Sequence, residues 1–261
     1  MRSADPGSRA PAPALVAYFM VDRRRRGRYR ALAAAARSAG ATHVELGFPF
    51  SDPIADGPVL QAVADRALRS GTDWTDLLAA LREARRELPP IVMSYANPLL
   101  VGGLPRRLGS IAQAGARGLI VPDLSLEESG PWAAAARTTG LDLILLAAPG
   151  SSTARARALA RASRGFLYLV SRYGTTGAGE IARPAQLVPI VRAAHRAAPQ
   201  RPVYVGFGIR DAATARSALR AGADGVIVAS VLESALEGGS EAAVVRRVLR
   251  PIARALRSSA A

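Results

Sequence analysis

The chain has 261 residues, of which 49% are hydrophobic, and this suits one α/β barrel or all-β domain with a sizeable core. Its net charge is +15, but all 35 basic residues are arginine, and they are scattered without the interleaved aromatic residues of a nucleic-acid site, so we expect no nucleic-acid partner. Cysteine and lysine are both absent, which excludes disulfides, a cysteine nucleophile, Schiff-base aldolase chemistry and pyridoxal phosphate attachment.

The two ends of the chain differ from its centre in composition. Residues 1–13 are rich in Pro, Ala and Ser and contain no apolar stretch like that of a signal peptide, so we expect a disordered arm. No linker divides residues 14–257, and no apolar run approaches the roughly 18 residues needed to span a membrane. We therefore expect a single cytoplasmic domain over residues 14–257, with no membrane association.

From the N-terminus onward, short apolar runs alternate with longer segments rich in Ala, Arg and Leu. The runs predict eight strands: Leu15–Met20, His43–Leu46, Ile91–Ser94, Gly118–Val121, Leu141–Leu146, Phe166–Val170, Val203–Val205 and Gly225–Val228. The longer segments predict helices: Tyr29–Ala39, Val59–Ser70, Trp74–Glu87, Leu104–Ala114, Glu127–Thr139, Thr153–Ser163, Pro184–Ala197, Asp211–Ala221 and Leu232–Leu256.

Eight strands, each followed by helix, predict a single-domain α/β fold, the (β/α)8 TIM barrel, whose usual length is about 250 residues. The alternative is an open doubly wound sheet. That fold would usually have fewer strands and a Gly-x-Gly-x-x-Gly motif after the first one, which the segment Leu15–Asp22 lacks.

Glu45 interrupts the second apolar strand near its C-terminal end. In such barrels the chemistry takes place at the C-terminal ends of the strands, and side chains alternate along a strand, so Glu45 should face the barrel mouth. Asp52 and Asp56 follow in a loop that its prolines restrict, at the same mouth. Burying an acid is costly unless it is paired or protonated. A structural ion pair between Glu45 and a barrel arginine is the alternative to a catalytic acid.

Glycine-rich segments follow the sixth and seventh strands, and a short Ala-Ser segment follows the eighth. Residues 206–209, GFGI, follow the seventh, and Ala229 and Ser230 follow the eighth, where barrels of this kind commonly bind phosphate. Glycine lets backbone N–H groups approach phosphate oxygens closely. Residues 171–179 follow the sixth strand and have the composition of a mobile lid, or of an ordinary flexible connector.

The segment from Glu45 to Pro58, ELGFPFSDPIADGP, closely resembles the signature of the tryptophan synthase alpha chain family. Residues 95–98 (YANP), 168–177 (YLVSRYGTTG) and 206–209 (GFGI) resemble the other motifs of that family in the right order. The likeness covers roughly residues 15–257. A sugar-phosphate isomerase or epimerase would explain the last two loops but gives no reason for the long signature.

The resemblance implies retro-aldol cleavage of indole-3-glycerol phosphate to indole and glyceraldehyde 3-phosphate in L-tryptophan biosynthesis, without metal or cofactor. With only two histidines, His43 and His195, the composition also argues against a metal site. By this resemblance, Glu45 protonates the indole C3 and helps to take the proton from the glycerol hydroxyl, and Asp56 stabilises the charge at the indole N–H. A carboxyl group in an apolar pocket has a raised pKa, which suits a proton donor.

The resemblance also implies a set of residues that bind the substrate. Tyr168 would orient Glu45 or the substrate, and Gly177, Gly208 and Ser230 would hold the phosphate. The full set is Tyr95, Tyr168, Thr176, Gly177, Phe207, Gly208 and Ser230.

The sequence departs from the family pattern at several positions. Arg23–Arg26 stand where a Gly-Asp-Pro turn is usual, the Pro-rich arm replaces an N-terminal helix, and Ala229 and Thr175 replace a usual glycine and valine. The arginine run begins just after the first strand, so its first members should lie at the rim of the barrel mouth. It is either a solvated loop or a positive rim that attracts the phosphate substrate or an acidic partner.

The resemblance implies a partner, the tryptophan synthase beta chain, in a heterotetramer of two alpha and two beta chains. Two alternatives remain open from the sequence. One is a freestanding indole-releasing lyase of secondary metabolism, and the other is a non-catalytic subunit that activates a beta chain.

Overall fold

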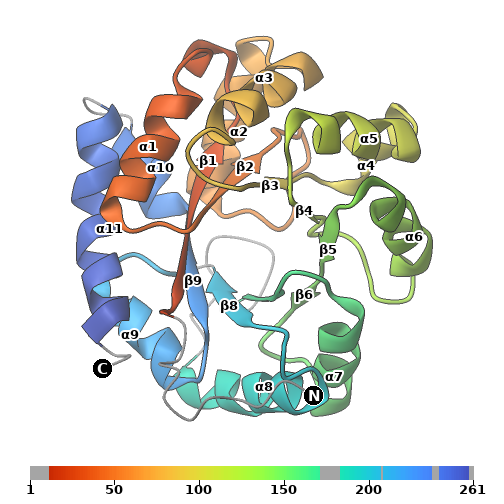
Figure 1. Ribbon diagram of the computed structural model, residues 1–261, viewed down its shortest axis with the longest axis vertical. Coiled ribbons are helices and arrows are strands. Elements are labelled where there is room, and N and C mark those ends of the chain that lie inside the picture. Colours follow the sequence, from red (N-terminus) through yellow and green to blue (C-terminus); the bar gives the residue numbers. More distant parts are fainter. Residues whose placement is uncertain (1–11, 171–182, 207, 237–240, 259–261) are drawn as a thin grey trace.

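The structure is a computed structural model that describes residues 12–170, 183–206, 208–236 and 241–258, and in it a parallel sheet is ringed by helices (Figure 1). The strands are β1 (Ala14–Met20), β2 (His43–Gly47), β3 (Pro90–Met93), β4 (Gly118–Ile120), β5 (Asp142–Ile144), β6 (Leu146–Ala147), β7 (Leu167–Val170), β8 (Val203–Gly206) and β9 (Gly225–Val228). The helices are η1 (Arg23–Arg25), α1 (Tyr29–Ala39), α2 (Pro58–Arg69), α3 (Trp74–Ala84), α4 (Ala96–Val101), α5 (Leu104–Ala114), α6 (Ser129–Thr139), α7 (Thr153–Ala162), α8 (Pro184–Ala197), α9 (Ala212–Arg220), α10 (Ser230–Leu236) and α11 (Glu241–Ser258).

The sheet closes on itself. Its strand order is β5-β4-β3-β2-β1-β9-β8-β7-β6, and all the pairings are parallel. β5 and β6 are two halves of one strand interrupted at Leu145: β5 pairs with β4, and β6 pairs with β7. Across the interruption, Tyr168 N donates to Leu145 O at 3.1 Å. The predicted (β/α)8 barrel is therefore confirmed, and the predicted fifth strand corresponds to β5 and β6 together.

Alternation along each strand divides the core into two layers. The larger cluster lies between the sheet and the helices and includes Leu15, Ala17 and Phe19 of β1. The smaller one fills the barrel and includes Tyr18 and Met20 of the same strand. Because side chains alternate along a strand, one strand supplies both layers. Burial of this apolar surface is the main stabilising contribution to the barrel.

The end of the barrel opposite the mouth is filled by stacked aromatic rings. The rings of Phe166 and Tyr204 stack with their centroids 4.3 Å apart, and both side chains belong to the inner cluster. At the other end, α2 lies against the mouth, because Leu60, Val63 and Ala67 on its apolar face pack against the inner cluster. The cavity formed by the described residues therefore lies at the C-terminal ends of the strands.

Glycine ends several of the outer helices. Gly40, Gly115 and Gly140 cap α1, α5 and α6 with positive φ angles between 73° and 109°, a conformation that side chains other than glycine disfavour.

Two short helices, η1 and α4, were not predicted from the sequence, and the single helix expected over 232–256 is in fact two, α10 and α11. Neither short helix is long enough to show a helical period, and a periodic pattern does not reveal a break between helices.

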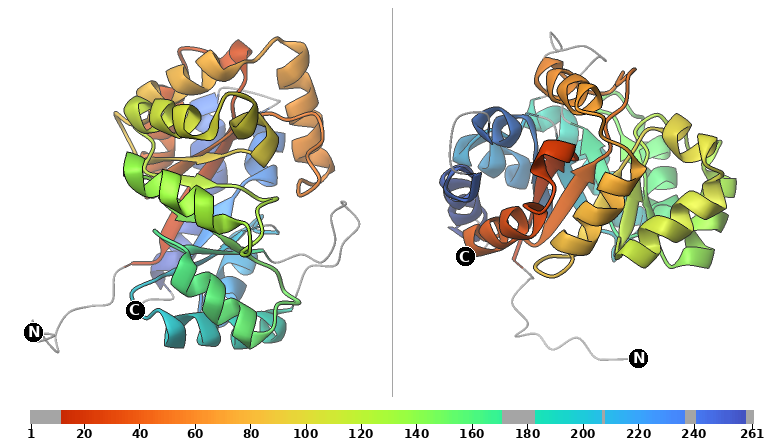
Figure 2. Two further views of the ribbon diagram at one scale, coloured as in Figure 1. Left: turned by 90° about the vertical axis from the view of Figure 1, so that its right-hand side faces the viewer. Right: turned by 90° about the horizontal axis from the view of Figure 1, so that it is seen from above.

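Some expectations concern residues outside the described part of the chain. They are most of the N-terminal arm (1–11), the glycine-rich segment 171–179 with Thr175, Thr176 and Gly177, and Phe207. Within residues 12–258, where the structure describes them, no helix is both long enough and apolar enough to cross a membrane. Figure 2 shows β1 running through the centre of the molecule, with the helices around it.

Candidate active site

Glu45 lies on the inner face of the barrel, near the mouth. In the sheet it pairs with Tyr18 of β1 and Ile91 of β3, both members of the inner cluster, while its neighbours Val44 and Leu46 belong to the outer one. The side chain is 1% exposed, and Glu45 Oε2 has no hydrogen-bond partner. The alternation of β2 therefore places an acid in the apolar interior, as the sequence predicted. The described residues contain no ion pair between Glu45 and an arginine.

Asp56 lies in the loop between β2 and α2 and is 3% exposed. Tyr95 fixes one carboxylate oxygen, because its hydroxyl donates to Asp56 Oδ2 at 3.1 Å and itself accepts from Ala55 N at 3.0 Å. A backbone turn holds the loop from within, with Asp56 N donating to Pro53 O at 3.0 Å. Asp56 Oδ1 has no partner. One oxygen of the group is therefore held by the protein, and the other is left without a donor.

Burial and proximity raise the pKa of both acids. Desolvation raises the pKa of Glu45 to about 8, and the nearby charge of Asp56 contributes. Desolvation also raises the pKa of Asp56 to about 6, while the hydrogen bond from Tyr95 opposes this change by lowering it. Two interacting acids titrate as a pair, and their surroundings decide which one loses its proton first. Glu45 keeps its proton to higher pH, because it is the more buried acid and no hydrogen-bond donor offsets its desolvation. At neutral pH, Glu45 is mainly protonated and Asp56 mainly ionised.

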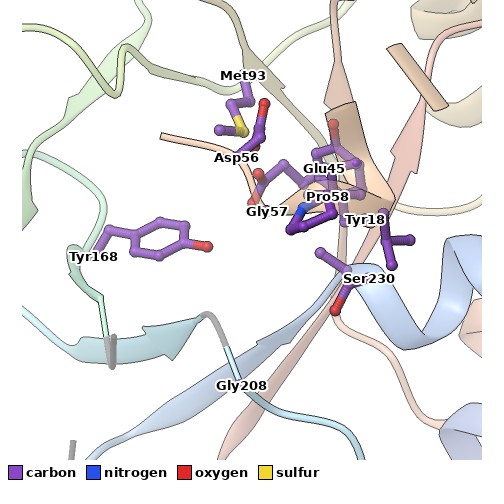
Figure 3. Close-up of a pocket in the computed structure, with 12 residues that line it drawn as sticks. Tyr18, Glu45, Asp56, Gly57, Pro58, Met93, Tyr168, Gly208 and Ser230 are labelled. Carbon is purple, nitrogen blue, oxygen red and sulfur yellow. The ribbon is translucent and has the colours of Figure 1, made fainter. Parts of the chain in front are cut away.

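The two acids line one cavity at the barrel mouth (Figure 3). Most of the other lining residues are apolar or lack a side chain, and the described lining consists of Tyr18, Glu45, Asp56, Gly57, Pro58, Val59, Leu60, Met93, Tyr168, Gly208, Ala229 and Ser230. An apolar cavity with a few convergent polar groups is the usual form of a small-molecule site. This one suits a ligand with a flat apolar body and a polar end.

Tyr168 extends into this cavity from β7, with its hydroxyl directed toward the acid pair (Figure 3). Its ring lies directly over Gly206 of the neighbouring strand, since a Cβ atom at that position would come within 2.2 Å of the Tyr168 hydroxyl. Tyr18 lies over Gly47 in the same way, at 2.0 Å. The two tyrosines thus reach the cavity because each lies over a strand-ending residue that has no side chain.

Gly208 and Ser230 lie at the other end of the cavity, beside Ala229. Gly208 has a φ angle of +87°, which favours glycine, and Ser230 begins α10. The structure therefore brings together five of the predicted site residues: Glu45, Asp56, Tyr168, Gly208 and Ser230.

Of the other predicted site residues, only Tyr95 belongs to the described part of the chain, and it is not among the described lining residues. Tyr95 reaches the cavity only through Asp56, as its hydrogen-bond partner. Thr176, Gly177 and Phe207 lie outside the described residues.

The arginine run at the rim is paired with acids. Arg23 Nε lies 3.2 Å from Asp76 Oδ2, Arg24 Nε lies 3.0 Å from Asp22 Oδ2, and Arg25 Nη1 lies 2.9 Å from Glu233 Oε1. Arg26 also faces Asp76, at 3.8 Å. These acids offset part of the positive charge of the run, while the side chains of Arg23, Arg24 and Arg26 remain 47%, 56% and 58% exposed to solvent. The sequence could not show this, because most of the acids come from distant segments.

The lining residues that were not predicted as site residues include two on strands, Tyr18 and Met93. Both lie on inward-facing positions close to the C-terminal end of a strand. Counting two residues back from the predicted end of the first strand, Met20, gives Tyr18. The predicted end of the third strand, Ser94, is one residue beyond its observed end, so the same count would have missed Met93. Within the described part of the chain, no group of three His, Asp or Glu side chains is arranged to hold a metal ion.

Comparison with known proteins gives one consistent result. A sequence model described as "Tryptophan synthase alpha chain" matches residues 8–256. The tryptophan synthase alpha chain of Synechococcus elongatus is 48% identical over 195 residues, which cover 73% of this chain and 72% of that one. The alpha chain of a Synechocystis species is 45% identical over 196 residues, covering 74% of each.

Solved structures give the same picture. Tryptophan synthase from Mycobacterium tuberculosis, in its aminoacrylate-bound form, superposes with a TM-score of 0.82 and 33% identity over 94% of both chains. The alpha subunit from Legionella pneumophila gives a TM-score of 0.82 and 28% identity, over 94% of this chain and 93% of that one. The similarity therefore extends over the barrel and both of its buried acids.

Proposed function

The chain belongs to the tryptophan synthase alpha chain family, and from this membership we infer that it is a lyase of tryptophan biosynthesis. Its reaction is the cleavage of indole-3-glycerol phosphate to indole and glyceraldehyde 3-phosphate. The observation that best supports this chemistry at the cavity is the pair of buried acids, Glu45 and Asp56, whose pKa values differ in the direction that the reaction needs.

We propose that Glu45 carries the proton. A carboxyl group with a pKa of about 8 is mainly protonated at neutral pH, so it can donate to C3 of the indole ring. The carboxylate left behind then takes the proton of the glycerol hydroxyl next to the breaking bond. The glycerol carbon that bears this hydroxyl becomes the aldehyde carbon of glyceraldehyde 3-phosphate. The electrons of the broken carbon–carbon bond return to the indole ring. One proton is given and one is recovered, so Glu45 ends each turnover as it began.

We propose that Asp56 stabilises the intermediate charge. Protonation at C3 makes the indole nitrogen positive, and an ionised carboxylate close to its N–H group lowers the energy of that state. The pKa of Asp56, about 6, keeps the group ionised at neutral pH. The hydrogen bond from Tyr95 leaves Asp56 Oδ1 as the oxygen that can accept the indole N–H. Tyr168, on the inner wall, would orient Glu45 or the substrate.

The phosphate of the substrate is assigned to the opposite end of the cavity. Gly208 and Ser230 line that end, and glycine there would let backbone N–H groups approach an anion. Gly177 and Thr176, from the segment outside the described residues, would complete this site. No lysine is needed for this reaction, which agrees with a chain that contains none.

We further propose that a tryptophan synthase beta chain binds at the barrel mouth. Three large apolar side chains are exposed there, Ile54 by 58%, Leu100 by 53% and Val101 by 76%. Ile54 lies in the loop of Asp56, and the other two lie in α4, whose first turn contacts that loop through Tyr95. Exposed apolar residues grouped in this way are typical of protein interfaces. A biosynthetic enzyme of this kind would work in the cytoplasm.

The direct test is to incubate the purified chain with indole-3-glycerol phosphate and to measure indole, with and without a beta chain. Indole release by the chain alone, increased when the beta chain is added, is the expected result. Release that the beta chain does not change would favour a freestanding lyase. Absence of indole in both mixtures, together with activation of the beta chain, would mean that the chain is a non-catalytic activator and that the proposed roles of Glu45 and Asp56 are wrong.

A further inference from the structure

The helix that begins with Ser230 contains a buried acid that no step of the reaction uses. Glu233 lies one turn after Ser230 in α10, and it is 0% exposed. Its Oε1 atom accepts two hydrogen bonds, from Met20 N at 2.7 Å and from Arg25 Nη1 at 2.9 Å. The Arg25 side chain is itself only 13% exposed. This is therefore a largely buried ion pair close to the end of the cavity assigned to phosphate.

The partners of Glu233 lie at the mouth end of a different strand. Met20 is the last residue of β1, and Arg25 lies in η1, which follows that strand. Arg25 Nε also lies 3.8 Å from Glu241 Oε1, at the start of α11. One guanidinium group thus connects the turn after β1 to both α10 and α11.

The turn that carries Arg25 is itself fixed. Tyr29 holds it from inside, since Asp22 N donates to the Tyr29 hydroxyl at 2.8 Å. Arg23 N donates to Thr72 Oγ1 at 2.9 Å on the other side. Arg25 therefore extends from a rigid base, and its guanidinium group can determine where α10 sits.

A helix as short as α10 depends on such contacts for its position. It has seven residues, and Leu232 and Leu236 bury its apolar side. Apolar contacts are not directional, so they hold the helix against the barrel without fixing its position along the wall. Hydrogen bonds from a backbone N–H and a guanidinium group are directional and do fix it.

We propose that the Arg25–Glu233 ion pair is a positioning device for the phosphate end of the substrate. It fixes the first turn of α10 against the end of β1, and through that turn it holds Ser230 at the distance from Gly208 that a phosphate group requires. The arginine-rich turn, unusual for the family, thereby takes part in substrate binding without touching the substrate. This inference rests on the proposed phosphate site.

The test compares two substrates, indole-3-glycerol phosphate and its phosphate-free analogue, indole-3-glycerol, in the parent and in Arg25→Gln and Glu233→Gln. Both variants should raise KM for the phosphorylated substrate by about tenfold, as expected when a charged hydrogen-bond contact is loosened. Turnover at saturation should change little, and kcat/KM for the analogue should stay within about twofold of the parent. Inorganic phosphate should become a weaker competitive inhibitor in the same proportion.

Two further variants make the comparison specific. Arg24→Gln is the matched control. It removes a positive charge from the same turn, but the partner of Arg24 is Asp22, which does not belong to α10. It should behave as the parent does. Arg25→Lys keeps the positive charge but replaces the planar guanidinium group with an ammonium group. Its KM for indole-3-glycerol phosphate should therefore lie between those of the parent and Arg25→Gln. Circular dichroism shows whether each variant is folded. If the two glutamine variants do not fold, the KM of Arg25→Lys tests the positioning role instead.

Three outcomes are distinguishable. KM within twofold of the parent in folded variants would overturn the positioning role and leave the reaction intact. Equal losses on both substrates would mean that the ion pair supports the fold alone, which also overturns it. A parent that cleaves the two substrates equally well would show that the phosphate site itself is misassigned, and the inference would fall with it.

Discussion

At the scale of single residues, the site depends on one carboxyl group kept protonated by burial and a second kept ionised by a hydrogen bond. Glu45 has an apolar environment and no donor on Oε2, whereas Asp56 accepts from Tyr95. The same loop also carries Asp52, which is exposed and whose carboxylate accepts a hydrogen bond from the hydroxyl of the adjacent Ser51. Burial, and not sequence proximity, therefore separates the acid that can do chemistry from the one on the rim.

Replacing Glu45 by Gln tests the proton transfer. Glu45→Gln keeps the shape of the protonated acid but cannot release a proton, so kcat should fall by about 10²–10⁴-fold while KM changes little. Asp56→Asn should also act mainly on kcat. Steady-state indole release measures both, and a Glu45→Gln variant within a few-fold of the parent would rule out the shuttle.

The pH profile of kcat/KM follows from the two pKa values. Activity should rise as Asp56 ionises near pH 6 and fall as Glu45 loses its proton near pH 8, giving a bell-shaped profile. Removing the hydrogen bond that lowers the pKa of Asp56, with Tyr95→Phe, should move the acidic limb to higher pH and leave the basic limb in place. An acidic limb that does not move would mean that ionisation of Asp56 does not control kcat/KM.

The same burial predicts that the active site destabilises the fold. The folded pKa of Glu45, about 8, lies above its ordinary value of 4.5. The contribution of Glu45 to the free energy of unfolding is therefore most favourable below pH 4.5, and it is lost as the pH rises through 8. At pH 7 the cost is about 3 kcal/mol.

Glu45→Gln should remove this cost, so its free energy of unfolding should exceed that of the parent at pH 7 and match it near pH 4. Urea unfolding at several pH values measures this difference. A variant that is less stable than the parent at pH 7 would contradict the raised pKa.

At the scale of elements, the inner wall of the barrel is shaped by glycines that end strands. Gly206 of β8 leaves room for Tyr168 of β7, and Gly47 of β2 leaves room for Tyr18 of β1. Each tyrosine therefore owes its position to the neighbouring strand. The arginine-rich turn after β1 works in the same way between elements, since its side chains bond to α3 and α10.

Gly206→Ala tests this arrangement. The added Cβ would lie 2.2 Å from the Tyr168 hydroxyl, so the ring must move away from the cavity. We expect kcat/KM to fall at least about tenfold, the size of effect that misplacing a group at the site produces. Gly109→Ala in α5 is the matched control, because nothing lies within 4 Å of the new Cβ. That variant should keep its activity and gain up to about 1 kcal/mol of stability. Equal activities of the two variants would mean that the position of Tyr168 does not matter.

At the scale of the whole molecule, the barrel separates stability from chemistry. The stacked rings of Phe166 and Tyr204 fill the lower end, and the acids and apolar side chains of the loops surround the upper one. Of the exposed apolar residues, Ile54 lies in a loop at that upper end, and Leu100 and Val101 lie in α4. A partner that covered them would also cover the entrance to the cavity, which gives a physical route for one chain to influence the other.

Val101→Glu tests the docking surface. A charge placed in an apolar interface is costly, so activation by a beta chain should require at least about tenfold more of that chain. Indole release by the variant alone should match that of the parent, because the side chain is 76% exposed and does not line the cavity. Arg216→Glu, in α9 on the other side of the barrel, is the control (Figure 1). Unchanged activation of the Val101→Glu variant would place the partner elsewhere.

The sequence by itself determined the barrel and the acid pair. Every strand was predicted to within two residues of its observed ends, because apolar runs and helix-ending glycines are local signals. The position of Glu45 followed from the two-residue alternation of β2, and the fourteen-residue signature identified the family. Each of these features depends on residues that are close together in the sequence, so a single sequence is enough to predict them.

Only the tertiary structure decided how the site is held. The contacts of Glu233 with Arg25, of Tyr95 with Asp56 and of Tyr168 with Gly206 each join residues at least 38 positions apart in the sequence. No local pattern specifies such a pair, because its energy arises only when the closed sheet brings the two segments together. For the same reason, the sequence left open whether the four arginines form a solvated loop or a positive rim, and only the fold shows the acid that lies beside each of them.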